Sequence, residues 1–224
     1  MYSQFRQKIL VTVYLKPDVE HYNSRKAAEE YHRTFTKDRG NLELKIKASE
    51  RYRKFISELR PGARILDAGC GTGRFIKYFI KDGFKVTGID LSISMIEIAT
   101  QTNPEASFRV MDMCNLDFPD HSFDGMWNVA TILHLNEFEV LKTFQESKRV
   151  LKKDGRLYVA TRTADVTCTS IEEAMEGGIM TIHYYSPEKL KELLISANFK
   201  VLEVSVERDD YSRPFDYVYI YAES

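Results

Sequence analysis

The chain has 224 residues, a mass of 26.0 kDa and a formal net charge of −1. This length suits one α/β domain with appendages, and the near-neutral charge excludes a large basic field that recruits a polyanion. No apolar run approaches the roughly 20 residues that are needed to cross a bilayer. We therefore expect a globular protein that uses neither a membrane nor a nucleic acid as its partner.

The three cysteines are scattered, at Cys70, Cys114 and Cys168, and no C-x-x-C pair occurs. This odd count and this spacing argue against a disulfide scaffold and against a zinc cluster. No metal site is predicted, and the cysteine usage favours a reducing, cytoplasmic location.

The N-terminal segment contains the apolar run Ile9–Leu15, preceded by Arg6 and Lys8. The arrangement loosely resembles a secretory signal, but no small-x-small cleavage site follows it. A β-strand or a packing arm is the simpler expectation, because strand-forming residues dominate the run.

A helix is expected from Ser24, which can cap it, to about Lys37, and a second helix from about Leu42 to Leu59. A regular alternation of strands and helices then begins. Strands are expected at 64–68, 85–90, 106–111, 123–129 and 156–161, with helices at 74–82, 92–101 and 137–151 between them. This rhythm predicts a doubly wound α/β fold with a parallel sheet and right-handed crossovers.

The pattern loosens after the fifth strand. We expect a polar insert from Asp165 to Thr181, then a helix that begins at Ser186-Pro187 and ends near Ala197. Two further strands are expected at 200–207 and 217–222, separated by a charged turn. Two strands after a single helix make the last strand pair antiparallel.

The most informative motif is D-A-G-C-G-T-G, which runs from Asp67 to Gly73 after the first strand of the alternating region. Glycine at every second position lets a ligand lie against bare backbone. A dinucleotide fingerprint would need a third glycine at the position that Arg74 occupies. A phosphate loop would need Gly-Lys followed by Ser or Thr, and neither tripeptide occurs. The carboxylate of Asp67 would repel a pyrophosphate and suits a cationic ligand.

This motif resembles motif I of the class I S-adenosylmethionine-dependent methyltransferases of the small-molecule type. The resemblance implies a Rossmann-like, seven-stranded, mostly parallel sheet with an antiparallel C-terminal strand, helices on both faces and an N-terminal helical extension. It implies S-adenosylmethionine as cofactor and S-adenosylhomocysteine as product. We expect an N-terminal arm and lid helix over 1–41 and the cofactor-binding domain over 42–224. In this family Asp67 faces the cofactor's ammonium, and the loop that wraps its methionine portion corresponds to Gly69, Cys70, Gly71 and Gly73.

The resemblance also assigns roles at the ends of the next strands. Asp90 would accept both ribose hydroxyls, although it could instead cap the following helix, where Ser92 is the better cap by position. Leu91 would pack on the adenine, and Met95 belongs to the family's S-x-x-M-x-x-x-A pattern. After the third strand, the resemblance places Asp112 beside the adenine amino group and gives Met113 a backbone contact to the cofactor. At the end of the fourth strand, it places Asn128 near the methionine end of the cofactor. A solvated turn acid is the alternative for Asp112.

The acceptor is harder to predict, because the sulfonium already activates the methyl group and the protein supplies mainly geometry and desolvation. The run that begins at Asn128 lacks the prolines typical of amino-group methylation on bases or glutamine. Cytosine C5 methylation needs a cysteine nucleophile, typically after a proline, and no Pro-Cys pair occurs. Arsenic methylation would need cooperating thiols, and the three cysteines are scattered. Methyl transfer to an O, N or S atom of a small molecule remains the leading hypothesis.

Candidate acceptor-side residues come from three segments. His134 follows the fourth strand and could act as a base, or it could be a structural histidine that bonds a neighbouring loop. The H-Y-Y run from His183 to Tyr185 resembles acceptor-side stretches of the family, with aromatic packing as the alternative. Tyr22 and Tyr31 are expected in the lid.

Two other functions stay open. One is a methyltransferase that acts on tRNA or protein, and the other is a non-catalytic protein that binds S-adenosylmethionine. A homodimer is possible, because the apolar N-terminal segment could pair with the sheet edge of another subunit.

Overall fold

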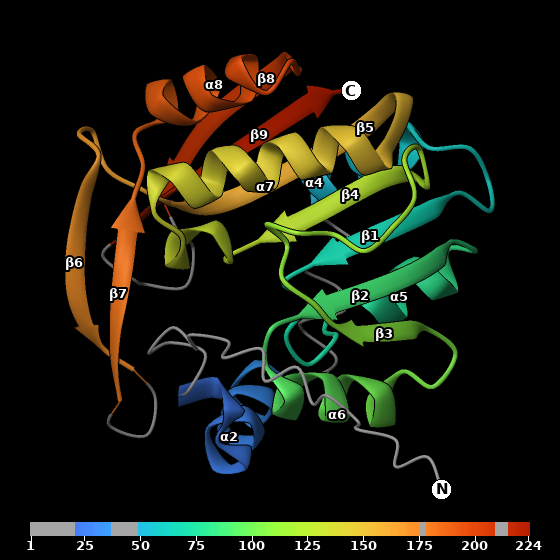
Figure 1. Ribbon diagram of the computed structural model, residues 1–224. Helices are drawn as coiled ribbons and strands as arrows, with labels where there is room; N and C mark the ends of the chain where they lie inside the picture. The colour runs from blue at the N-terminus through green and yellow to red at the C-terminus, as the bar shows by residue number, and fades with distance from the viewer. Residues whose placement is uncertain (1–20, 37–48, 175–177, 209–214) are drawn as a thin grey trace, which may run out of the picture.

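The computed structural model of the protein describes residues 21–36, 49–174, 178–208 and 215–224. The expected arm at Ile9–Leu15 and the start of the expected second helix lie outside these residues. A seven-stranded sheet with the order β3-β2-β1-β4-β5-β9-β8 forms the centre (Figure 1). Its strands are β1 Arg64–Ala68, β2 Lys85–Asp90, β3 Ser107–Val110, β4 Phe123–Val129, β5 Leu151–Thr163, β8 Lys200–Arg208 and β9 Asp216–Glu223.

The first five strands pair in parallel, whereas β9 runs antiparallel to both of its neighbours, β5 and β8. The predicted fold class, with an antiparallel C-terminal strand in a doubly wound sheet, is therefore confirmed. The chain reverses its winding direction between β1 and β4, and a ligand crevice is expected where such a switch occurs, at the carboxyl ends of the strands.

Helices cover both faces of the sheet. Their bounds are α2 Arg25–Thr36, α4 Glu50–Ser57, α5 Ile76–Lys81, α6 Ile93–Thr102, α7 Glu137–Val150 and α8 Pro187–Ser196. One apolar core lies between the sheet and α7 with α8, and a second lies between the sheet and α4, α5 and α6. Figure 1 shows α7 across the near face, with α4 and α5 behind the sheet.

Local capping explains where several helices begin. The Ser92 hydroxyl accepts the N–H of Met95 at 3.1 Å and thereby caps α6, as its position predicted. Asn136 and Glu139 form a reciprocal capping box at the start of α7. Ser186 caps α8, whose first residue is the expected Pro187.

In the alternating region two elements begin two or more residues away from their predicted starts. Helix α5 begins at Ile76, because the loop continues as turns in which Gly73 donates to the Cys70 carbonyl and Ile76 donates to Gly73. Strand β5 begins at Leu151, before the expected turn, because Leu151 already pairs with Phe123 ahead of a register shift in β4.

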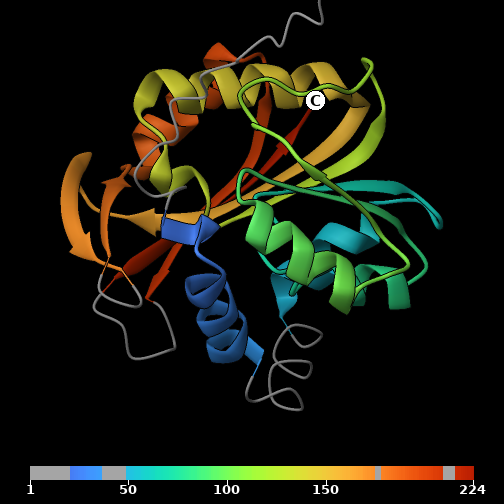
Figure 2. The same cartoon turned by 60° about the horizontal axis from the view of Figure 1, so that its bottom comes forward.

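The expected polar insert contains a β-hairpin that the sequence analysis missed. Strands β6 Cys168–Glu173 and β7 Ile179–Tyr184 pair antiparallel and form a separate two-stranded sheet. Its exposed positions include the large apolar residues Ile171 and Ile179, while its less exposed positions include the polar Ser170 and Glu172, so polarity does not follow burial and gives no strand signal. Figures 1 and 2 both place this hairpin across the carboxyl end of β4 and β5, with α2 beneath it.

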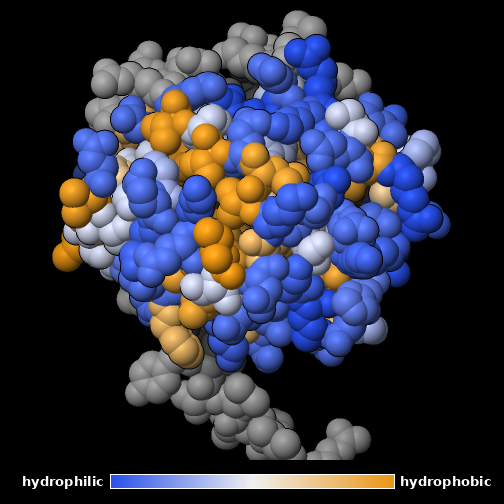
Figure 3. Space-filling model, turned by 90° about the horizontal axis from the view of Figure 1, so that it is seen from above, coloured by the Kyte–Doolittle hydropathy of each residue, from blue (hydrophilic) through white to orange (hydrophobic). Residues whose placement is uncertain are grey.

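The sheet ends in an open edge at β8. Figure 3 shows a band of apolar surface on the side of the molecule that carries α8 and β8. The exposed large apolar side chains on these two elements are Ile195, Leu202 and Val206. Among the described strands β8 forms one edge of the sheet, and the homodimer stays a prediction.

The second core depends on a cluster of aromatic side chains around Trp127. The ring of Trp127 stacks on Tyr158 at a centroid distance of 4.0 Å and meets Phe55 of α4 edge-on at 5.1 Å. We expect Phe55→Ala to lower the free energy of unfolding by about 3–5 kcal/mol, because it opens a cavity in this cluster. Chemical denaturation of the purified protein measures the change.

Phe138 provides a matched control, since it also lies on a helix but is 74% exposed. Phe138→Ala should change stability by no more than about 0.5 kcal/mol. Equal effects of the two substitutions would contradict this account of the core.

Candidate functional site

The glycine loop that follows β1 is tied to the end of β2 by its backbone. The N–H groups of Gly69 and Cys70 both donate to the carbonyl of Ile89, at 2.8 and 2.9 Å. The next amide, of Gly71, donates to Oδ2 of Asp90 at 3.0 Å. The loop thus lies over the switch point of the sheet, with its conformation fixed by the neighbouring strand.

Close packing explains two of the glycines. A Cβ on Gly69 would lie 2.2 Å from Cγ2 of Thr131, and a Cβ on Gly73 would lie 2.7 Å from Nδ2 of Asn103. Both glycines also have positive φ, +75° and +76°. The sequence analysis missed the role of Thr131, although its position just after β4 was a usable signal, since all parallel strand ends share one edge.

Asp67 is the most unusual group of the site. It is 2% exposed, and its Oδ2 has no hydrogen-bond partner among the described residues. Burial raises the pKa of this carboxyl to about 7, Arg74 counteracts the shift, and Asp90 adds to it. A buried carboxylate without a full set of partners is costly, and a cationic ligand would compensate it.

Asn128 lies beside Asp67 at the end of β4. Its Nδ2 donates to the Ala68 carbonyl at 3.1 Å and contacts the sulfur of Met113 at 3.7 Å. Its Oδ1 is buried and unpartnered within the described part of the chain, as is the hydroxyl of Thr72 in the glycine loop. Thr72 was not predicted as a site residue, although the loop that contains it was.

Asp90 connects the loop to helix α6. One carboxylate oxygen accepts from Gly71, and the other accepts the N–H of Ser92 at 2.9 Å. Burial raises the pKa of Asp90, while the Ser92 and Gly71 bonds and the nearby His134 oppose the shift. The N-cap of α6 is Ser92 and not Asp90, which accepts the N–H of that cap residue, and the remaining lone pairs of the carboxylate can still accept from a ligand.

Other predicted cofactor residues differ in burial. Leu91 is half-buried. Met95 is a buried residue of α6 and packs in one cluster with Ala28 of α2. Asp112 turns one oxygen back to the N–H of Cys114 at 2.8 Å, which is a local turn contact. Cys70 is buried, and burial together with Asp67 raises the pKa of its thiol, which agrees with its assignment as a small filler.

Helix α2 and the residues before it form a cover over this edge. The carbonyl of Tyr22 accepts from the Ser92 hydroxyl, and Asn23 accepts from Ile93 N–H and from the Ser94 hydroxyl. The ring of Tyr31 stands over the loop, since a Cβ on Gly71 would lie 3.5 Å from it. Burial raises the pKa of Tyr31, and Asp90 adds to the shift.

The acceptor-side candidates lie on neighbouring elements. His134 ends the short 3-10 helix η1 Ile132–His134, and its ring meets Tyr22 at 6.2 Å. His183 on β7 contacts the Thr169 hydroxyl at 3.0 Å. Tyr185 is 2% exposed, and its hydroxyl donates to the Leu135 carbonyl. The structure thus brings His134 to the loop, whereas Tyr185 supports η1 from the core.

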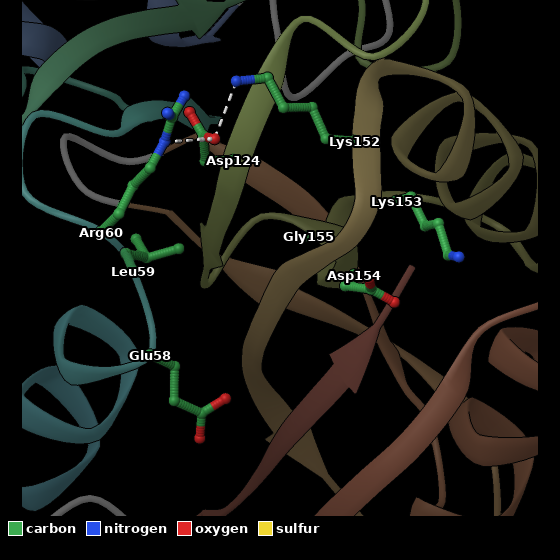
Figure 4. A pocket seen from close by; sticks show the side chains of 8 residues that line it. All are labelled: Glu58, Leu59, Arg60, Asp124, Lys152, Lys153, Asp154 and Gly155. Atoms are coloured by element: carbon green, nitrogen blue, oxygen red, sulfur yellow. Dashed lines mark hydrogen bonds and ion pairs between the residues drawn. The ribbon is translucent and has the colours of Figure 1, made fainter.

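A cavity of about 170 Å³ lies at the opposite, amino end of the sheet (Figure 4). Its charged groups pair with one another: Asp124 binds Lys152 at 2.8 Å and Arg60 at 3.3 Å, and it accepts the N–H of Arg64. These contacts satisfy Asp124. Among the described residues, no group of three or more possible metal ligands occurs, and no helix is long and apolar enough to cross a membrane.

The raised pKa of Asp67 predicts that the free energy of unfolding of the ligand-free protein depends on pH. Between about pH 4 and 7 the folded state binds a proton that the unfolded state does not bind, so stability falls as pH rises through this window. Asp67→Asn should therefore raise the free energy of unfolding above pH 7 by about 2–4 kcal/mol, and the gain should shrink toward pH 4. Denaturant titrations at pH 5 and 8 measure this, with the exposed Asp165→Asn as control. A less stable Asp67→Asn protein at pH 8 would contradict the account.

Comparisons with known proteins agree with this geometry. A family model described as a methyltransferase domain matches residues 66–159, which include the glycine loop and β1 to β4. The chain is 40% identical over 109 residues to a 2-methyl-6-phytyl-1,4-hydroquinone methyltransferase of Synechocystis sp., covering 47% of this chain and 34% of the relative. It is 32% identical over 167 residues to the O-methyltransferase rstn1 of Aspergillus nomiae, covering 69% of this chain and 71% of the relative.

The fold is also that of solved methyltransferases. An S-adenosylmethionine-dependent methyltransferase structure from Methanosarcina mazei superposes with a TM-score of 0.70 at 21% identity, covering 77% of this chain and 97% of that one. The chain spans only about a third of the length of the Synechocystis relative. With the glycine loop, the acidic strand ends and these matches together, the chain belongs to the S-adenosylmethionine-dependent methyltransferase family, and its cofactor is S-adenosylmethionine.

Proposed function

We propose that the protein transfers the methyl group of S-adenosylmethionine to a small molecule, at an O, N or S atom, with a hydroxyl oxygen as the favoured site. One observation carries the proposal: within the described residues, Oδ2 of Asp67 and Oδ1 of Asn128 are buried without partners beside a glycine loop that leaves its backbone open to a ligand. The names of the two relatives, an O-methyltransferase and a hydroquinone methyltransferase, support a small hydroxylated acceptor.

The residues present fit the cofactor. Asp67 and Asn128 offer buried oxygens to its ammonium, and the loop from Gly69 to Gly73 leaves room along its backbone. When bound, S-adenosylmethionine supplies a methyl group that its sulfonium already activates. In this proposal Asp90 accepts from the ribose hydroxyls. Leu91, Asp112 and Met113 form the adenine side.

The chain's own contribution is then to hold the two reactants together and to exclude water. Helix α2 covers the loop through Tyr31, and we propose that the predicted N-terminal unit, 1–41, acts as a lid over the domain 42–224. The lid also reaches the hairpin, since a Cβ on Gly178 would lie 2.4 Å from Nδ1 of His21. Tyr22 and Tyr31 would then face the acceptor side of the enclosed space.

A proton must leave an acceptor hydroxyl as the O–C bond forms. His134 is the better placed of the two candidate histidines, because it lies near Asp90 and Tyr22, whereas His183 is bonded to Thr169 on the hairpin. We propose that His134 accepts this proton. The neighbouring carboxylate would stabilise the imidazolium that forms.

Cofactor binding tests the role of Asp90. We expect Asp90→Ala to weaken S-adenosylhomocysteine binding by about 1–3 kcal/mol, because the ribose hydroxyls lose a buried acceptor and the loop loses its anchor at Gly71. Isothermal titration calorimetry measures this, with the exposed Glu105→Ala as control. Unchanged affinity would remove Asp90 from the site.

Turnover tests the role of His134. His134→Ala should lower kcat by a factor of about 10²–10⁴ while S-adenosylhomocysteine affinity stays near that of the wild type. His121→Ala is a matched control at the amino end of the sheet, where that ring contacts the Leu151 carbonyl. An unchanged kcat for His134→Ala would assign proton transfer to another group.

Incubation of the enzyme with S-adenosylmethionine and a pool of phenolic metabolites, followed by mass spectrometry, tests the activity itself. Gain of one methyl mass on a small molecule supports the proposal. Methylation of added tRNA or protein instead would favour the macromolecular alternative, and tight cofactor binding without turnover would favour a non-catalytic protein. A cytoplasmic location stays a prediction.

A further inference from the structure

A charged and aromatic cluster lies where the hairpin meets the end of β5. Arg162 of β5 binds Glu172 of β6 at 2.8 Å, and the hydroxyl of Tyr184 on β7 donates to Glu172. The guanidinium of Arg162 also stacks over the ring of Phe215, 4.1 Å from its centroid. None of these contacts is explained by the cofactor site.

The cluster faces the space beside the cofactor loop. Glu172 and Tyr184 share one face of the hairpin, because their register partners are Met180 and Cys168 on the opposite strand. On that face Tyr184 belongs to one apolar cluster with Leu133, which precedes His134, and Ala130, just after β4, packs against this cluster.

The lid approaches the same cluster from the other side. Arg162 pairs in register with Tyr217 of β9, so both side chains lie on one face of the sheet. Tyr217 is close enough to Tyr31 to raise the pKa of its hydroxyl. Arg162 thus lies between the hairpin and the ring that covers the glycine loop.

Arg162 and Asp67 lie on the same face of the sheet. Asp67 pairs in register with Trp127, which pairs with Tyr158, and Arg162 lies four residues further along β5, on the same side as Tyr158. The guanidinium therefore lies beyond Asp67 toward the carboxyl ends of the strands.

Stability alone does not account for an ion pair in this place. Arg162 is 15% and Glu172 25% exposed, and the residues beside them, Phe215 under the guanidinium and Met180 in register with Glu172, are apolar. Replacing such a pair by apolar residues is often neutral or stabilising, so its presence favours a role in recognition.

The bonding pattern indicates what is recognised. Both oxygens of Glu172 are engaged, one by Arg162 and one by Tyr184, and within the described residues Arg162 donates only through Nη1. The open capacity is therefore that of guanidinium donors, which bind an accepting oxygen. The adjacent Glu172 carboxylate repels an anion and leaves a neutral carbonyl oxygen as the best fit.

We propose that Arg162, oriented by Glu172 and Tyr184, determines acceptor specificity by binding the carbonyl oxygen of a planar aromatic acceptor. This inference rests on the proposed function and names the substrate class of that same site. Phe215 and Tyr184 offer aromatic surface beside the guanidinium, and in this proposal the hydroxyl of the acceptor points toward the methyl donor and His134.

The test compares three phenols that differ only in the para substituent, on enzyme saturated with S-adenosylhomocysteine. We expect para-hydroxyacetophenone to bind at least about tenfold more tightly than para-ethylphenol, which lacks the carbonyl, and more tightly than para-hydroxybenzoate, which is an anion. Arg162→Met keeps the apolar stem on Phe215 and should abolish the preference for the ketone. Glu172→Gln should improve binding of para-hydroxybenzoate severalfold, because the repelling charge is gone.

Arg156→Met is the matched control, since Arg156 also lies on β5 and is also paired with carboxylates, but at the opposite end of the sheet. It should leave the preference unchanged. Thermal melting and S-adenosylhomocysteine affinity report whether each variant is folded and loaded. Equal affinity for the ketone and para-ethylphenol, no binding of any of the three, or an unaltered preference in Arg162→Met would each overturn the inference. A wild-type protein that fails to bind S-adenosylhomocysteine would overturn the proposed function itself.

Discussion

The buried carboxylate of Asp67 is the constraint on which the rest of the site depends. It lies at the end of β1, 2% exposed, with one oxygen unpartnered in the described chain and a pKa raised by burial to about 7. Such a group costs folding free energy in the free protein and is useful only when a cation arrives. The glycine loop, the Asn128 amide and the lid are all arranged around the place where that cation would sit.

Asp90 fixes the glycine loop and the start of α6 relative to each other at the switch point of the sheet. Its two oxygens hold the Gly71 amide on one side and the start of α6 on the other. Helix α2 is fastened to that same start of α6 by the carbonyl of Tyr22 and by Asn23. The loop, the Asp90 carboxylate and the segment before α2 are therefore joined by hydrogen bonds through the start of α6.

The sequence predicted the parts of this protein whose physics is local or periodic. The bounds of β1, β2 and β4, the Ser92 cap and Pro187 at the start of α8 follow from side-chain alternation and capping chemistry. The hairpin β6–β7 was missed because its outward residues, such as Ile171 and Ile179, are exposed apolar groups that break the usual alternation. Thr131 packing on Gly69 and the Arg162 cluster depend on contacts between distant segments, which no local pattern contains.

Proton release on cofactor binding reports whether the carboxylate of Asp67 receives the ammonium of the cofactor. Titration of S-adenosylhomocysteine at pH 7 in two buffers of different ionisation enthalpy gives the number of protons exchanged. Because Asp67 is about half protonated there and must ionise to bind a cation, the account predicts release of roughly half a proton, abolished in Asp67→Asn. Binding of equal strength in both proteins without any proton release would contradict it.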